Sequence, residues 1–532
     1  MLHFQLLPNN EIGISFHYDP AIIEIIKTLS HRRWDSISKQ WICPLSIAPE
    51  IQLVTKHKLP EHIYQQHNLI YSNQQIQYNP SLLKISPYPF QIEGIKFLSQ
   101  TKNTLCADDV GLGKTLQAIA TTLHLNCKKV LIICPASVKR QWQGEISKFT
   151  SHQSQLIEGT QPQRKEQYSS ISPTFFIINY ELLLHDLPLI NLRQWDMVIA
   201  DEITRIKNYR SKTLLSLSQV KTNFKLGLSA TPLENSLKEL HSIFSWINPH
   251  ILGRWYDFVN QYTYYRKTPW NSYEITGIKN KELLHLNLKK AMIRRKKSDV
   301  FQQLPSITRQ EYYVPLSSQQ RLLYEQIRNK VITLIDKPNF NHNDQINTLT
   351  ELLYLRECCS SPRLLNQDLK ENGKIPEIIA ILEQLNKSKI ILFTQWKKFG
   401  DLLVEEIQKK WKCIFIHGDI LPENRDKLIS EFKESSDINI LVTTDCLMYG
   451  MNLQFCDTII HCDLLFNPQK MMQREGRVHR IGQEKPVTII TVMTQDTIEE
   501  KVYNLLQEKQ TLFDEVIEGQ VIDRELIKKI MR

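Results

Sequence analysis

Short apolar runs rich in Val and Ile alternate with longer amphipathic stretches from about residue 90 onward. Stretches such as "KKVLIICPAS", "TFFIINY", "WDMVIADE" and "FKLGLSAT" have short apolar centres, which predict strands that are buried on both faces. Between them, stretches such as "SVKRQWQGEISKF" have the spacing of surface helices. This alternation predicts a parallel sheet covered by helices.

The same pattern starts again near residue 389, with "KIILFTQW", "KCIFIHGD", "INILVTTD", "TIIHCD" and "VTIITVM". Helical periodicity separates the two patterned regions, in "SQQRLLYEQIRNKVITLID" and "QINTLTELLYLRECC", while "DKPNFNHNDQ" (residues 336–345) is expected to be an exposed loop. The predicted fold class is α/β, with two parallel-sheet lobes and a small α+β module before them. The expected parts are residues 1–75 (module), 76–250 (lobe 1), 251–370 (helical insertion and linker) and 371–532 (lobe 2).

Composition narrows the class of protein. The net charge of +10 permits a polyanionic partner such as nucleic acid without requiring one. The 10 cysteines are scattered, and no C-x-x-C pair suggests a zinc site, so buried free thiols in a reducing compartment are expected. Neither a signal peptide nor an apolar run long enough to span a membrane is found, and a soluble cytoplasmic protein is expected.

The stretch "CADDVGLGKTLQAIA" predicts a phosphate-binding loop. Gly111 and Gly113 allow backbone N–H groups to approach phosphate oxygens at the start of a helix. Lys114 can reach the β- and γ-phosphates, and the Thr115 hydroxyl can bind Mg²⁺. Asp108 stands where the strict pattern has Gly, so this is the looser form of the motif used by helicase-like ATPases.

A later apolar run, "WDMVIADEITRIKN", ends in Asp201 and Glu202. Adjacent acids in this place are either a solvated strand end or a catalytic pair. If a nucleotide with Mg²⁺ binds here, Asp201 suits the role of metal ligand and Glu202 suits the role of positioning the attacking water.

Further motifs follow in order: "PYPFQIEGIKFL", "LGLSATPLENSLKELHSIFSWINP", "MIRRKKSDVFQQLP", "FIHGDILPENRDKLISEF", "LVTTDCLMYGMNLQFCDTIIHCD" and "FNPQKMMQREGRVHRIGQ". Over about residues 85 to 510 the series resembles the Swi/Snf-type DNA-dependent ATPases of helicase superfamily two. The resemblance implies two RecA-like lobes with ATP and Mg²⁺ in the cleft between them.

The resemblance also implies roles for individual residues. Gln91 would read adenine, and the other nucleotide-binding positions would be Asp109, Gly111, Leu112, Gly113, Lys114, Thr115 and Gly450. The metal ligands would be Thr115 and Asp201, and the catalytic residues Lys114, Asp201, Glu202, Gln473, Arg477 and Arg480, with Arg480 as the arginine finger. Taken alone, "REGRVHR" would be read as a solvated basic helix face.

Two positions depart from the family pattern. Thr204 stands where His or Gln is usual, which puts the strength of coupling between ATP and DNA in doubt. "Ser229-Ala230-Thr231" replaces the commoner Gly-Thr form and is read as tolerated variation.

By the same resemblance, positions that face DNA are Ser137, Asn179, Tyr180, Gln395, Trp396, Thr443 and Thr444. Ordinary loop capping is the alternative for each of them. "RRKK" (residues 294–297) is either a further phosphate contact or a solvated helix face.

The stretch "ISFHYDPAIIEIIKTLSHRRWDSISKQWICPL" is predicted to form a strand, a helix and a second strand. It resembles the HepA-related module of annealing helicases, which binds fork or junction DNA. The matching positions are Tyr18, Ile25, Lys27, Trp34, Asp35, Lys39 and Trp41. A small packing domain without a DNA role is the alternative.

The favoured function is an ATP-driven translocase on double-stranded or forked DNA that remodels DNA-bound proteins or branched DNA, expected as a monomer. A strand-separating DNA or RNA helicase and a DNA-binding subunit with a decayed motor are the alternatives.

Overall fold

The computed structural model describes residues 2–27, 29, 31–72, 78–206, 211–230, 237–267, 273–300, 305–338, 341–385, 389–447, 453–465, 468–504 and 531. Two compact units make up the chain. The first contains Met1–Asp108, Lys114–Pro232 and Lys238–Arg295. The second contains Asp109–Gly113, Leu233–Leu237 and Lys296–Arg532.

The N-terminal module of the first unit is a four-stranded antiparallel sheet in the order β1-β2-β4-β3, with its helices. Asn9 and Asn10 have φ of 65° and 59° in the turn between β1 and β2, a conformation that asparagine tolerates. The predicted strand, helix and strand are confirmed, and two further strands complete the sheet. The elements are β1 (His3–Leu7), β2 (Glu11–Ser15), α1 (Pro20–Lys27), β3 (Arg33–Asp35), β4 (Gln40–Pro44), η1 (Leu45–Ile47), α2 (Ala48–Thr55) and α3 (Glu61–Ser72).

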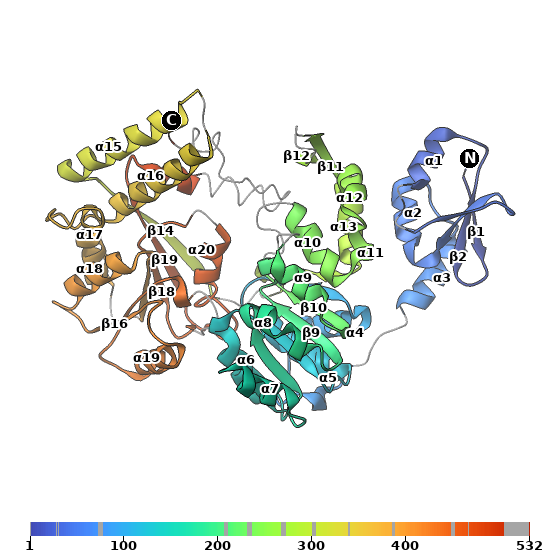
Figure 1. The fold of residues 1–532 in the computed structure, drawn as a ribbon, viewed down its shortest axis with the longest axis horizontal. Helices are drawn as coiled ribbons and strands as arrows, with labels where there is room; N and C mark the ends of the chain where they lie inside the picture. Colours follow the sequence, from blue (N-terminus) through green and yellow to red (C-terminus); the bar gives the residue numbers. More distant parts are fainter. Residues whose placement is uncertain are drawn as a thin grey trace. The chain divides into compact units, whose positions relative to one another are not determined.

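Lobe 1 is built on a parallel sheet in which seven strands are described, in the order β13-β5-β10-β9-β6-β8-β7. Every residue of β6 is buried, as its continuous apolar run predicts. Helices α4 to α9 lie around β9 and β10 (Figure 1). The elements are η2 (Pro80–Leu82), α4 (Pro89–Thr101), β5 (Thr104–Cys106), α5 (Lys114–His124), β6 (Val130–Cys134), η3 (Ala136–Val138), α6 (Lys139–Phe149), β7 (Ser154–Leu156), α7 (Gln161–Ser169), β8 (Phe175–Asn179), α8 (Tyr180–Ile190), β9 (Trp195–Asp201), η4 (Ile203–Ile206), α9 (Lys212–Ser218) and β10 (Thr222–Leu228).

The span expected to be a helical insertion and linker also contains strands. One of them, β13, extends the sheet of lobe 1 beside β5, and another, β14, extends the sheet of lobe 2 beside β19. Both are edge strands, and their polar or short runs do not show the apolar pattern of a central strand. The elements from residue 237 to 314 are α10 (Leu237–Ile247), α11 (Pro249–Leu252), α12 (Trp255–Tyr262), β11 (Thr263–Lys267), β12 (Tyr273–Ile278), α13 (Lys281–Lys289), β13 (Met292–Ile293), α14 (Lys297–Val300) and β14 (Ile307–Val314).

Lobe 2 contains a second parallel sheet, with six described strands in the order β14-β19-β18-β15-β17-β16. Its elements are α15 (Ser318–Ile335), α16 (His342–Ser360), η5 (Pro362–Leu364), α17 (Ile375–Gln384), β15 (Ile390–Phe393), α18 (Lys397–Ile407), β16 (Cys413–Ile416), α19 (Pro422–Glu434), β17 (Ile440–Thr443), η6 (Asp445–Leu447), β18 (Thr458–His461), α20 (Pro468–Glu475) and β19 (Val487–Thr494).

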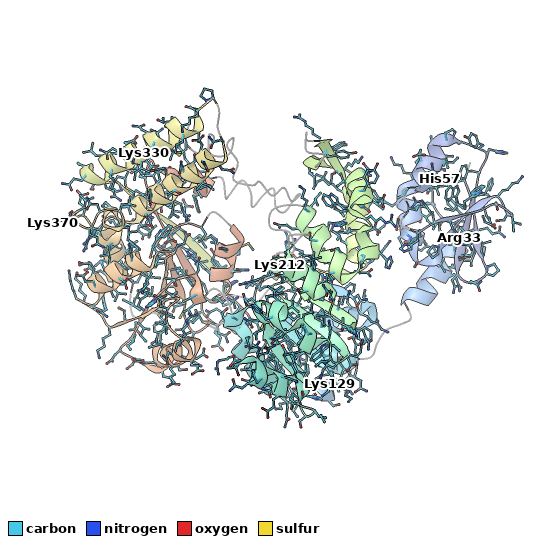
Figure 2. The ribbon with its side chains drawn as sticks, viewed as in Figure 1. Arg33, His57, Lys129, Lys212, Lys330 and Lys370 are labelled. Carbon is cyan, nitrogen blue, oxygen red and sulfur yellow. The ribbon has the colours of Figure 1, made fainter. Side chains whose placement is uncertain are left out.

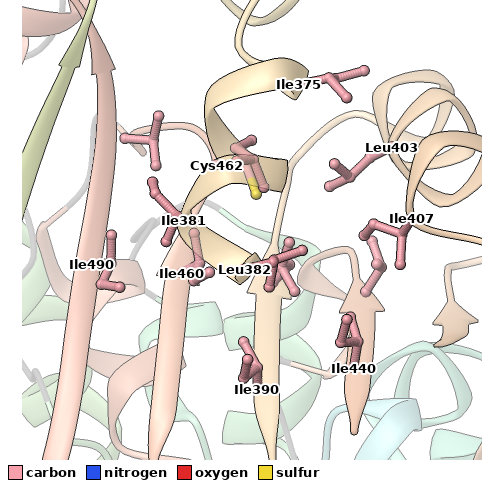
Figure 3. Close-up of a cluster of buried hydrophobic side chains, with 14 of the residues drawn as sticks. Ile375, Ile381, Leu382, Ile390, Leu403, Ile407, Ile440, Ile460, Cys462 and Ile490 are labelled. Carbon is pink, nitrogen blue, oxygen red and sulfur yellow. The ribbon is translucent and has the colours of Figure 1, made fainter. Parts of the chain in front are cut away.

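An apolar layer joins α17 and α18 to this sheet. Figure 3 shows it, with Ile375, Ile381, Leu403 and Ile407 from the helices and Ile390, Ile440, Ile460 and Ile490 from the strands. The loop expected at residues 336–345 is shorter than predicted, because Asn341 caps α16 through a hydrogen bond from the amide of Asp344 (3.0 Å).

All ten cysteines are free thiols. None of the helices in the described part of the chain has the length and apolar character needed to cross a bilayer.

Candidate nucleotide site

The predicted phosphate loop connects β5 to the first turn of α5. Gly111 and Gly113 have φ of 88° and 75°, a region that side chains disfavour and that turns the backbone sharply before the helix. Lys114 is the first residue of α5, and its Nζ donates a hydrogen bond to the carbonyl oxygen of Asp108 (2.7 Å). An eleven-residue helix that begins at such a loop directs N–H groups and a positive dipole end toward an anion.

Asp108 is fully buried below this loop and makes an ion pair with Arg295. Arg295 Nε lies 3.0 Å from Asp108 Oδ1, and the Gln117 amide donates to Asp108 Oδ2 at 3.0 Å. The next acid, Asp109, accepts a hydrogen bond from the amide of Lys297 (3.0 Å). The segment "RRKK" was expected to be a phosphate contact or a solvated face. For Arg295 both readings are wrong, because its side chain is only 12% exposed and holds the phosphate loop.

The acid pair lies at the carboxyl end of β9. The indole Nε1 of Trp142 donates to Asp201 Oδ2 (2.8 Å), and the amide of Glu202 donates to Asp201 Oδ1 (2.9 Å). Glu202 has φ of 48°, which is uncommon for a residue with a long side chain. Such conformations persist where the surrounding structure enforces them, often at functional sites.

Tyr180 supports the same acid through the backbone, since its hydroxyl donates to the carbonyl oxygen of Asp201 (2.7 Å). Burial, together with the charge of Asp201, raises the pKa of Tyr180 well above its usual range. The hydroxyl therefore keeps its proton and acts as a donor. Sequence reasoning missed the Trp142 contact, because Trp142 shares the apolar face of α6 with Ile146 and Phe149 and reads as an ordinary core residue.

Strand order brings the phosphate loop and the acid pair to one edge of the sheet. The strand between β5 and β9 is β10, and all three run parallel, so their carboxyl ends face the same side. Ser229 follows β10, and its amide bonds the carbonyl of Cys106 (3.1 Å). Thr204 is buried in η4, while Thr231 lies outside the described residues.

Gln91 is buried near the start of α4, where its Oε1 accepts a hydrogen bond from the amide of Tyr88 (3.0 Å). This contact fixes the side chain at the beginning of the helix. Its reading of adenine stays a prediction.

The donor set fits a nucleotide with Mg²⁺. Among the described residues no three His, Cys, Asp or Glu side chains form a metal cluster. Magnesium is usually held by one or two protein oxygens together with phosphates and water, and Thr115 and Asp201 would supply such oxygens. Backbone N–H groups of the loop and Lys114 would hold phosphates.

The predicted lobe 2 residues are in and just after α20. Gln473 is buried, and its Oε1 has no hydrogen-bond partner in the part of the chain that the structure describes, while Arg477 and Arg480 are half-buried. Arg474 is fully buried and bonds Asp445 through Nε (2.8 Å). Gly450 lies outside the described residues.

Glu475 ends α20 and receives two hydrogen bonds from Arg309 of β14, at 2.9 and 2.7 Å. Burial alone would raise the pKa of Glu475, but Arg309 and His461 lower it to about 2. The helix that carries Gln473 is thus tied to an edge strand of lobe 2.

The positions expected to face DNA have varied surroundings. Asn179 donates to Glu181 (2.7 Å), and Gln395 donates to the carbonyl of Leu464 (3.0 Å). Thr443 is fully buried, and its hydroxyl bonds the carbonyl of Ile416 (3.0 Å). The others are Ser137 and Trp396, which are half-buried, and Tyr180 and Thr444, which are buried. The DNA contacts stay predictions.

Comparison with known proteins supports the family resemblance that the motifs indicate. The model of the SNF2-related domain matches residues 90–364, and that of the helicase conserved C-terminal domain matches residues 373–482. An uncharacterized ATP-dependent helicase of Mycoplasma pneumoniae is 30% identical over 450 residues, which are 80% of this chain and 42% of that protein. The chromodomain-helicase-DNA-binding protein 1-like of Danio rerio is 29% identical, over 81% of this chain and 44% of that protein.

The chain therefore spans less than half the length of these relatives. A solved structure, the Sulfolobus solfataricus SWI2/SNF2 ATPase core in complex with dsDNA, is 26% identical with a TM-score of 0.41, covering 86% of this chain and 99% of that one. The family matches begin at residue 90, so the HepA-related resemblance of the N-terminal module stays a prediction. With more than half of its length matched by one family model, the chain belongs to the SNF2-related family of helicase-type ATPases.

Proposed function

We propose that the chain hydrolyses ATP and uses the energy to move along double-stranded DNA, remodelling DNA-bound proteins or branched DNA. The observation that carries this proposal is the phosphate loop and the acid pair at one edge of a single sheet, in a chain of this family. DNA as the track is supported by relatives named a DNA-binding helicase and, in Arabidopsis thaliana, a probable ATP-dependent DNA helicase.

The chemistry follows from the residues at the sheet edge. Lys114 and the N–H groups of α5 would bind and orient the phosphates, and Thr115 and Asp201 would hold the metal. Mg²⁺, when bound, neutralises charge on the phosphate oxygens. Glu202 accepts a hydrogen bond from the attacking water and orients it, and Arg480 contributes positive charge to the transferring group.

Net charge is consistent with a polyanionic partner. The chain carries 66 Lys and Arg against 56 Asp and Glu. Basic side chains occur on every part, for example Arg33, Lys129 and Lys330 (Figure 2). Contacts to phosphates give sequence-independent binding, which a translocating protein requires.

We further propose that the N-terminal module binds fork or junction DNA. Two aromatic rings project from it, with Tyr18 84% and Trp34 51% exposed, and Trp34 lies edge-on to Trp41 at 5.5 Å. Exposed aromatic rings stack on unpaired bases.

The first experiment measures steady-state ATP hydrolysis at one stated salt concentration, without nucleic acid and with duplex DNA, forked DNA, single-stranded DNA or RNA. Duplex or forked DNA is expected to stimulate turnover without strand separation. Stimulation by RNA alone, or strand displacement, would replace the translocase with a helicase. Absence of hydrolysis with DNA binding retained would indicate a motor that no longer works.

The same assay tests the N-terminal module. Trp34→Ala is expected to reduce stimulation by forked DNA and to leave stimulation by plain duplex unchanged. Equal loss on both substrates would contradict a role in fork recognition.

A further inference from the structure

Two buried aromatic side chains converge on Asp201 from neighbouring helices. Trp142 of α6 binds the carboxylate, with Nε1 2.8 Å from Oδ2, and Tyr180 of α8 binds the backbone carbonyl at 2.7 Å. Trp142 is 2% exposed and Tyr180 3% exposed. Each therefore uses its single polar hydrogen on the same acidic residue.

The Trp142 contact differs from the ordinary satisfaction of a buried polar group. A buried Trp N–H needs an acceptor, and a main-chain carbonyl normally suffices. Trp195, at the other end of β9, donates in that way to the carbonyl of Ile190 (3.0 Å). Trp142 instead donates to an ionised group, and such bonds are shorter and stronger than neutral ones.

Both helices begin at the edge of the sheet that carries the acid pair. Parallel β6 lies between β9 and β8, so the carboxyl ends of these three strands are adjacent. The loop after β6 contains η3, with Ser137, and leads directly into α6. Asn179 ends β8, and Tyr180 is the first residue of α8. Ligands of open parallel sheets bind at this edge.

We propose that Trp142 and Tyr180 are positioning residues that set the geometry of Asp201 and couple it to the loop after β6 and to the junction of β8 with α8. Nucleic acid bound at this edge shifts the starts of α6 and α8, and the two hydrogen bonds carry that shift to the acid. This inference rests on the proposed function for the identity of the ligand. The positioning of Asp201 itself rests only on the contacts.

The backbone contact has a separate consequence for Glu202. The left-handed φ of this residue directly follows the carbonyl that Tyr180 holds. A fixed carbonyl stabilises the sharp turn that orients the Glu202 side chain. Trp142 thus acts on the metal-binding acid, and Tyr180 acts on the turn between the two acids.

The test uses variants that remove each donor and keep an aromatic side chain, Trp142→Phe and Tyr180→Phe. Trp142→Phe also loses the volume of the second indole ring, a loss that its control shares. Matched controls in the same lobe are Trp195→Phe and Tyr168→Phe, which remove a buried indole and a buried hydroxyl away from Asp201; the Tyr168 hydroxyl bonds Asp186 at 3.3 Å. Two quantities are measured: the ratio of duplex-stimulated to basal turnover, and the Mg²⁺-dependent gain in affinity for a fluorescent non-hydrolysable ATP analogue, by anisotropy.

For Trp142→Phe, we expect both quantities to fall roughly tenfold, the scale of one hydrogen bond to a charged group. Affinity for the analogue in EDTA stays unchanged, because the phosphate loop is intact. Tyr180→Phe is expected to lower the stimulation ratio by about threefold, since its bond is to a neutral carbonyl. In the double variant the effects are less than additive, because both bonds act on one residue.

Equal behaviour of Trp142→Phe and Trp195→Phe in both measurements would overturn the inference, as would full additivity in the double variant. Thermal melting shows whether each variant folds, and Tyr180→Phe carries the test if Trp142→Phe does not. If the wild-type chain is not stimulated by DNA, the proposed function fails. The anisotropy measurement then still decides the positioning of Asp201.

Discussion

The two lobes share a parallel sheet, but different contacts surround Asp201 in lobe 1 and α20 in lobe 2. In lobe 1, the indole of Trp142 and the amide of Glu202, both uncharged donors, bind the carboxylate of Asp201. In lobe 2, ion pairs anchor α20: Arg474 binds Asp445, and Arg309 binds Glu475. The two donors in lobe 1 orient the carboxylate of Asp201. A helix that is anchored by ion pairs keeps a fixed position for the arginines that follow it.

Lobe 1 also uses ion pairs. One joins Arg164 and Asp186 (Nε to Oδ2, 2.7 Å) away from the nucleotide site, and another lies below the phosphate loop. Asp108 and Arg295 are largely buried there and connect the loop to the end of β13. Charge pairing therefore supports the phosphate loop in lobe 1 and α20 in lobe 2, whereas an indole and a backbone amide orient the carboxylate that is proposed to bind metal. The predictions below test this division.

The largest effect is expected in lobe 2. Arg480→Ala should lower turnover by roughly 10³- to 10⁵-fold, because an arginine that stabilises the transferring phosphoryl group contributes on that scale. Binding of the ATP analogue should persist. Loss of binding with unchanged residual turnover would contradict this role of Arg480. Arg474→Lys is the control, because it perturbs the buried ion pair of α20 and shows what structural damage to this helix does to turnover.

In lobe 1, Lys114→Ala should lower turnover on the order of 10²- to 10³-fold, through loss of the charged contact to phosphate. Affinity for ATP should fall as well, which distinguishes this variant from Arg480→Ala. Turnover close to wild type would refute the assignment of the phosphate loop.

Arg295→Ala should lower the free energy of unfolding of the first unit by about 3–5 kcal/mol, since it leaves the carboxylate of Asp108 buried without its cation. Urea unfolding measures this change. Adding Asp108→Asn to Arg295→Ala should recover part of the lost free energy of unfolding. If nothing is recovered, the loss does not come from the unpaired carboxylate of Asp108.

The matching change in lobe 2, Arg309→Ala, should cost less, about 1–2 kcal/mol, because Arg309 is 53% exposed and water screens the pair. The pKa of Glu475 is about 2, below the ordinary pKa of a glutamate. The ion pair therefore stabilises lobe 2 fully at pH values above that ordinary pKa, and the stabilisation is lost as the pH falls toward 2. The difference in stability between the wild type and the variant should therefore be greatest near neutral pH. A difference that grows on acidification would contradict the assignment.

The smallest effect is expected at Thr204, which is buried in η4. Thr204→His should raise the ratio of DNA-stimulated to basal turnover by on the order of threefold, the scale of one weak hydrogen bond. The basal rate should change little. An unchanged ratio would show that Thr204 does not limit coupling.

Much of this architecture could be predicted from the sequence. Central strands such as β6 and β9 are recognisable because their middle residues are buried on both faces, so that residues 130–134 and 197–200 form apolar runs. The phosphate loop is equally local, since Gly111, Gly113 and Lys114 act through consecutive backbone groups. The prediction that Asp201 and Glu202 lie at the end of a strand is confirmed, because this position also depends only on consecutive residues.

Only the tertiary structure decided which partners hold these groups. Arg295 lies 187 residues from Asp108 in sequence, and Trp142 lies 59 residues from Asp201. Such pairs have no periodic signal, because each joins two segments that are adjacent only after the sheet has formed. The edge strands β13 and β14 escaped prediction because an edge strand has one paired side and less need of apolar residues. The sequence thus determined the local elements and the chemistry at their ends, and long-range packing determined the orientation of that chemistry.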